Sequence, residues 1–190
     1  FRVNTDLPND QFHPAVATDD DGNFTVVWGT LGQDASWFND VKGQQFNRDG
    51  ERIGSEFRVN DQNIPGLPGW EVVPSIGMNS QGEFIVAWER VSGEQGGVVT
   101  DSEVYARLFE PDATPVGPEF QVSPAGENAR NPQAVIDEQG NYSVAFEREL
   151  PAGNWGVLIQ SFDVTGNPLA GWAAPPLPVP IYGEIHFVNP

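Results

Sequence analysis

Hydrophobic and polar residues alternate with a period of two in short segments spaced along the chain. In the first segment, Phe24, Val26 and Trp28 lie on one face of an expected strand, and Thr25 and Val27 lie on the other. A period of two is typical of β-strands. Because both faces are apolar, one with large and one with small side chains, we expect this strand to belong to a sheet packed between two others.

The same segment occurs three times, which indicates an internal repeat of about 60 residues. Residues 14–28, 74–88 and 132–146 align, each running from a proline through a glycine to an aromatic residue, with offsets of 60 and 58 residues. Each unit then has an aromatic residue before a turn and ends in a closing motif, such as Glu56-Phe57-Arg58-Val59-Asn60. Copies of the closing motif stand at residues 1–4, 119–123 and 185–189.

These repeats predict an all-β fold in which each unit forms four antiparallel strands joined by glycine turns. We expect a single repeat domain over residues 1–190. Its units are residues 5–60, 61–123 and 124–189, preceded by an extra strand at 1–4. The first strand of each unit should begin just after the shared proline, which lacks a ladder donor. Four-stranded repeats of this length favour β-propeller-like blades. A three-sheet β-prism and a β-trefoil remain alternatives, because only three units are present.

The repeated pattern E-F-x-V-N, then P-x-V-A-x-D-x-x-G-x-F-x-V-x-W, then an aromatic residue before D-x-x-G, resembles tandem propeller-type repeats of bacterial secreted and surface proteins. The resemblance covers nearly the whole chain. The resemblance implies an extracellular or cell-surface location and a protein type in which such repeats occur beside adhesive and calcium-binding modules. Unit 3 departs from the pattern, because His186 stands where Phe57 and Phe120 stand in the other units.

Composition excludes several classes of function. The chain has 27 acidic and 9 basic residues among 190, a net charge of −18, so its field repels nucleic acid. It has no cysteine, which excludes disulfides, thiolate metal sites and a thiol nucleophile. No apolar run is long enough to insert into a membrane.

The favoured function is therefore that of a non-catalytic secreted or cell-surface protein acting through self-assembly or adhesion, as a homo-oligomer or filament. Phe1 and Val3, in the extra strand, would pair with a neighbouring chain. Tryptophans in expected loops would be interface anchors or, in the alternative of a carbohydrate-binding module, platforms for a glycan. These tryptophans are Trp37, Trp70, Trp155 and Trp172.

Calcium is the expected metal, because carboxylate oxygens suit a hard cation. Asp19 and Asp21, in an Asp-rich turn, are the first candidate ligands, although the turn lacks the glycine and glutamate positions of an EF-hand. A hairpin turn explains the same residues without a metal. His13 and His186 are the only histidines, and together they could hold copper or zinc.

A second alternative is a glycoside hydrolase, a class that uses two carboxylates. Glu89-Arg90 and Glu147-Arg148 stand at equivalent repeat positions, whereas unit 1 has Gly29-Thr30 there. The favoured interpretation is an ion pair repeated with the blade. Any site should lie at the end of the units that carries the longer loops, such as residues 91–102.

Overall fold

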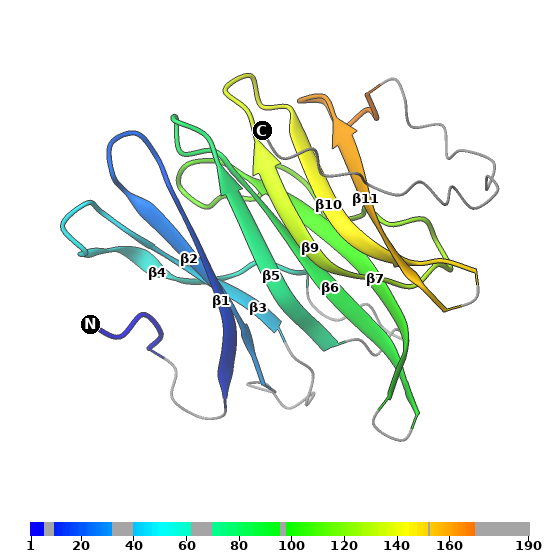
Figure 1. The fold of residues 1–190 in the computed structure, drawn as a ribbon. Coiled ribbons are helices and arrows are strands. Elements are labelled where there is room, and N and C mark those ends of the chain that lie inside the picture. Colours follow the sequence, from blue (N-terminus) through cyan, green and yellow to red (C-terminus); the bar gives the residue numbers. More distant parts are fainter. Residues whose placement is uncertain (6–9, 32–39, 62–69, 96–97, 152, 170–190) are drawn as a thin grey trace, which may run out of the picture.

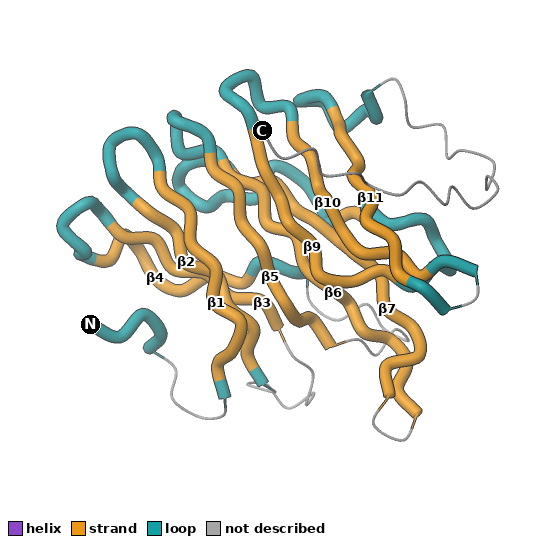
Figure 2. The backbone as a smooth tube through the Cα atoms, viewed as in Figure 1, coloured by secondary structure: helices purple, strands orange, loops and turns teal. Residues whose placement is uncertain are grey.

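The computed structural model describes residues 1–5, 10–31, 40–61, 70–95, 98–151 and 153–169 of the chain. These ranges contain eleven strands and no helix, and Figure 2 shows strands and loops throughout. The strands form three antiparallel sheets, which we call blades 1, 2 and 3 and which lie side by side in Figure 1. Within these described ranges, no helix could span a membrane.

Each blade is a meander in which consecutive strands are hydrogen-bonded neighbours. Blade 1 contains β1 (Gln11–Thr18), β2 (Phe24–Thr30), β3 (Asp40–Phe46) and β4 (Arg52–Arg58). Blade 2 contains β5 (Trp70–Met78), β6 (Phe84–Gln95), β7 (Val98–Phe109) and β8 (Phe120–Gln121). Blade 3 contains β9 (Ala129–Ile136), β10 (Tyr142–Glu149) and β11 (Trp155–Phe162). The all-β fold with propeller-like blades is confirmed, and the first strands β1, β5 and β9 are neighbours across the blades.

Buried clusters lie between each pair of adjacent blades, and a third, smaller cluster of Val26, Trp28 and Phe46 lies on the other face of blade 1. Alternation along β6 sends Phe84, Val86 and Trp88 toward blade 1, where they join one buried cluster. Ile85 and Ala87 point the other way, into the cluster shared with blade 3. The two apolar faces expected for the repeated strand are therefore both buried between blades, and this packing holds each blade at a fixed angle to the next.

The first strand of each blade begins before the shared proline rather than after it. In blade 2, β5 starts at Trp70, and its pairing with β6 shifts between Val72 and Ser75. Two residues, Val73 and Pro74, thus oppose one residue of β6, which is a β-bulge. A bulge leaves one backbone N–H outside the ladder, so proline is tolerated inside the strand.

Two further expectations differ from the structure. Residues 1–5 form no strand, and none of the described strands forms a ladder with them. Residues 91–95 and 98–102, expected as part of a loop, instead extend β6 and β7, which project from blade 2 in Figure 1. The expected fourth strand of unit 3, at residues 185–189, lies outside the described residues.

Candidate functional site

The three bulges give the inner strands a shared backbone feature. His13, Val73 and Asn131 precede the shared prolines and have positive φ angles of 49°, 50° and 53°. Non-glycine residues rarely adopt this region, and a β-branched one is a clear outlier. Such strain concentrates at sites where a side chain must be aimed in a fixed direction. In blade 3, the bulge places Asn131 between two carboxylates.

These carboxylates belong to Glu89 on β6 and Glu147 on β10. The backbone N–H of Asn131 lies 3.4 Å from Oε2 of Glu89. Nε of Arg130 donates to Oε2 of Glu147 at 2.8 Å, and the Asn131 side chain lies near enough to the same carboxylate to lower its pKa. Two neighbouring residues of β9 therefore connect both carboxylates at the end of the blades where the inner strands begin.

The two carboxyl groups have opposite electrostatic environments. Burial raises the pKa of Glu89 above its ordinary value, the Asn131 N–H and Arg130 oppose that rise, and the negative charge of Glu147 adds to it. Hydrogen bonds from Arg130 and Asn131 lower the pKa of Glu147. Between these pKa values, Glu89 is protonated while Glu147 is ionised. This is the division of roles that acid–base chemistry with two carboxylates requires.

Ion pairs recur at this position in blades 2 and 3, but they do not join the neighbouring glutamate and arginine. Neighbouring residues of a strand point to opposite faces, so Glu89 cannot pair with Arg90 beside it. Arg90 instead forms ion pairs with Glu71 on β5 and with Glu119 near the start of β8. In blade 3, Arg148 contacts Glu127 at 2.9 Å.

The Glu71–Arg90–Glu119 network is a second charged cluster, buried on the blade 1 side of blade 2. Nε of Arg90 lies 2.7 Å from Glu71, and its guanidinium lies 3.8 Å from the ring centre of Tyr105. Burial raises the pKa of Glu71 to about 7, although Arg90 opposes the shift. Burial alone would lower the pKa of Arg90, but the two carboxylates outweigh it and raise that pKa above its ordinary value.

Of the four candidate tryptophans, only Trp155 has a described side chain. It is 37% exposed, and the Arg130 guanidinium lies 3.7 Å from its ring centre. Trp155 therefore orients the arginine that holds Glu147. Trp70 begins β5. Trp37, Trp172 and the side chain of Trp70 lie outside the described residues.

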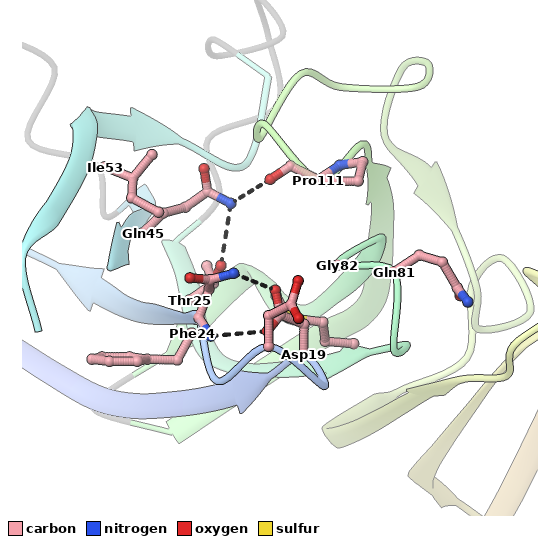
Figure 3. A pocket seen from close by; sticks show the side chains of 11 residues that line it. Asp19, Phe24, Thr25, Gln45, Ile53, Gln81, Gly82 and Pro111 are labelled. Carbon is pink, nitrogen blue, oxygen red and sulfur yellow. Dashed lines mark hydrogen bonds between the residues drawn. The ribbon is translucent and has the colours of Figure 1, made fainter. Parts of the chain in front are cut away.

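The Asp-rich turn lies at the opposite end of the blades. Asp19 accepts hydrogen bonds from the backbone N–H and the side-chain amide of Asn23, both at 2.8 Å. Asp137 and Asn141 repeat this arrangement in blade 3. Asp19 and Asp21 line a pocket of about 200 Å³, drawn in Figure 3, whose far wall includes Gln45 and the Pro111 carbonyl. The Asp19 carboxylate therefore accepts hydrogen bonds that stabilise the turn.

The other expected metal ligands are not brought together by the described part of the chain. His13 is exposed, with its ring against Phe12, and His186 lies outside the described residues. In that described part, no group of three or more His, Asp or Glu side chains is arranged to hold a metal ion. Calcium binding stays a prediction.

The sequence pattern did not indicate Arg130 and Asn131 as site residues. A signal was available for Asn131, since it precedes the shared proline as His13 and Val73 do. The alignment of the repeats did not predict a positive φ at this position, because it contains Val73 and β-branched residues rarely adopt positive φ.

No known family profile and no curated protein sequence matches the chain. Solved structures share its fold. A Hadza microbial sialidase matches with a TM-score of 0.61 and 12% identity, and the match covers 80% of this chain and 35% of the sialidase chain. An α-L-arabinofuranosidase from Lactobacillus brevis matches with a TM-score of 0.56 and 10% identity, covering 90% and 58%. A polysaccharide lyase, ulvan lyase, matches with a TM-score of 0.55 and 11% identity, covering 77% and 40%.

These comparisons overturn the expectation of a non-catalytic protein that acts through self-assembly or adhesion. These three solved structures are a sialidase, an arabinofuranosidase and a polysaccharide lyase, so the glycoside hydrolase alternative agrees better with them. At 10–12% identity the likeness establishes the fold, and the chain spans 35–58% of the length of these proteins. This chain is similar in fold to carbohydrate-processing enzymes.

Proposed function

We propose that this chain forms part of a carbohydrate-processing enzyme that cleaves glycosidic bonds with Glu89 and Glu147. Glu89 acts as the general acid that protonates the leaving oxygen. Glu147 acts as the ionised partner, either as base or as nucleophile. The observation that carries the proposal is the single pair Arg130–Asn131, which contacts both carboxylates while their pKa values are shifted in opposite directions.

The environments of the two groups support these roles. Glu89 is 7% exposed, and an acid that must hold its proton near neutral pH benefits from burial. The Glu147 side chain is 35% exposed and thus accessible to substrate or water. Arg130 and Asn131 are positioning residues, because each acts on the reaction through a carboxylate. A polysaccharide substrate also agrees with the extracellular location expected from the sequence.

The test is turnover of a panel of nitrophenyl glycosides, including α-L-arabinofuranoside, β-galactoside and sialoside, together with reducing-end release from polysaccharides. We expect Glu89→Gln and Glu147→Gln each to lower kcat/KM by about 10²- to 10⁴-fold. Glu149→Gln is the matched control, since Glu149 lies two residues further along β10 and binds Asn128 instead. Equal loss in all three variants, or no turnover by the folded protein, would contradict the proposal.

A further inference from the structure

Residues 1–5 contact blade 1 in the way that each closing motif contacts the blade that follows it. The ring of Phe1 lies 5.3 Å from Phe46, which stacks on Phe24 at 5.1 Å. Phe57 contacts the stacked pair Phe84 and Phe109, and Phe120 contacts the stacked pair Tyr142 and Phe162. The same three-ring contact therefore occurs three times, and in blade 1 its third member comes from residues 1–5.

Hydrogen bonds repeat the same relationship. The backbone N–H of Asp61, the residue after the closing motif of unit 1, donates at 2.9 Å to Glu119 in the closing motif of unit 2. The hydroxyl of Thr5 donates to Glu56 at 2.7 Å, and the Thr5 N–H donates to the same carboxylate. Residues 1–5 thus occupy, relative to blade 1, the place of a closing motif from a preceding blade.

The outer face of blade 3 has the chemistry of a face between blades. Val157 on β11 pairs with Glu147, as Val104 on β7 pairs with Glu89. Val104 is fully buried under blade 3, whereas Val157 is 80% exposed. Ile159 is 46% exposed at the position where Ala106 is fully buried. Apolar residues exposed at buried repeat positions indicate a surface that another blade covers.

The outer face of blade 1 is incomplete in the complementary way. Val16 pairs with Val26, as Ile76 pairs with Val86. Val16 is 63% exposed, whereas Ile76 is 9% exposed. Beside it, Val3, Phe12 and Trp28 line an apolar cavity of about 190 Å³. The outer faces of blade 1 and blade 3 therefore correspond to the two opposite sides of one blade–blade interface.

We propose that a second copy of this chain covers these faces, with blade 3 of each copy packing on blade 1 of the other. Both halves of the interface belong to one chain, so two copies related by a two-fold axis satisfy both without an unpaired face. Residues 1–5 of each copy, which contact blade 1, would then lie beside blade 3 of the other copy.

The equivalence of blade 1 and blade 3 in the repeat also places a residue of the second copy beside the proposed catalytic pair. Asn131 of blade 3 lies against Glu89 of blade 2, and His13 holds the position of Asn131 in blade 1. Docking of a second copy therefore brings its His13 beside Glu147. The dimer is inferred from the interfaces alone and does not depend on catalysis, so mass and turnover test the two proposals separately.

The test is the mass of the protein in solution by light scattering over a range of concentrations, with three substitutions. We expect twice 20.7 kDa for the unmodified chain and a monomer for both Val16→Glu and Val157→Glu. Val116→Glu is the matched control, because Val116 is 59% exposed outside either face, and it should remain a dimer. Removal of residues 1–5 should weaken the dimer at least tenfold.

A mixture of the Val16→Glu and Val157→Glu proteins provides a second readout. One of the two interfaces between such chains is intact, so mixing should restore a dimer that neither variant forms alone. Added salt should strengthen association, because each copy carries a net charge of −18 and salt screens the repulsion. A monomer at all concentrations, an open polymer, or a dimer that survives both face substitutions would overturn the proposal.

Discussion

Glu89 and Glu147 hold equivalent positions in adjacent blades, yet only Glu89 lies beneath the bulge of a following blade. Asn131 covers Glu89 through its backbone N–H, whereas it reaches Glu147 through its side chain. One repeated residue thus acquires two environments, because the two copies lie on opposite sides of the same inner strand. A repeat that places like residues in unlike surroundings produces the asymmetry that a catalytic acid and its partner need.

The pH dependence of turnover should therefore be bell-shaped. Activity requires ionised Glu147, so it falls as pH drops below the lowered pKa of that group. Activity also requires protonated Glu89, so it falls as pH rises above the raised pKa of Glu89. The measurement is kcat/KM against pH for the unmodified chain and for Glu149→Gln, which should share one profile. A profile without a basic limb would remove Glu89 from the role of acid.

Arg130→Gln should move the acidic limb of that profile to higher pH. The Arg130 hydrogen bond is the largest cause of the lowered Glu147 pKa, so its loss makes Glu147 easier to protonate. Arg148→Gln is the control, since Arg148 contacts Glu127 on the other face of β10. An acidic limb that stays in place while kcat falls would show that Arg130 acts on substrate instead of on Glu147.

The bulge conformation should make Val73→Asn a stabilising substitution. A β-branched residue at φ of 50° is strained, and asparagine tolerates this region, as Asn131 does in the same repeat position. We expect the free energy of unfolding to rise by about 1 kcal/mol, measured by urea denaturation. The reverse exchange, Asn131→Val, should lower stability. A loss of stability in Val73→Asn would mean that the valine side chain contributes more through packing than the backbone strain costs.

The fold could be predicted from the sequence because the hydrophobic pattern that determines it is local and occurs in three copies. Period-two alternation at Phe84, Val86 and Trp88 specifies which face meets which neighbour, and three copies confirm the register. The bulges could not be predicted, because a strand interrupted by Pro74 has the same local pattern as a strand that starts after it. The opposite pKa shifts of Glu89 and Glu147 arise from packing between blades, which no single repeat contains.

Close packing of inner strands predicts the effect of Gly77→Ala. A Cβ at Gly77 on β5 would lie 2.7 Å from both the Ala134 carbonyl oxygen and the Val135 Cα of β9, which are backbone atoms. Blades 2 and 3 would have to separate, at a cost of about 1–3 kcal/mol in the free energy of unfolding. Gly117→Ala is the control, because a Cβ there meets nothing within 4 Å. Equal stability of the two variants would show that β5 and β9 can move apart to accept the added Cβ at little cost in stability.

Glu71 should give the protein a pH-dependent stability between pH 4.5 and about 7. Its pKa is about 7 in the folded protein against an ordinary 4.5, so the folded state binds the proton more tightly than the unfolded chain. The stability from this group is complete below pH 4.5 and is lost as pH rises to about 7, by about 3 kcal/mol in total.

Glu71→Gln tests this dependence with little change of shape. Gln11 holds the equivalent position in blade 1, where it accepts a 2.6 Å hydrogen bond from Trp28, so an amide fits this place in the repeat. The variant should gain stability relative to the unmodified chain as pH rises from 5 to 8, in urea denaturation at each pH. Exposed Glu110 provides the control substitution, Glu110→Gln. If the difference between Glu71→Gln and the unmodified chain is constant over this range, Arg90 holds Glu71 ionised despite its burial and despite the negative charge of Glu119, and the network is a permanent ion cluster.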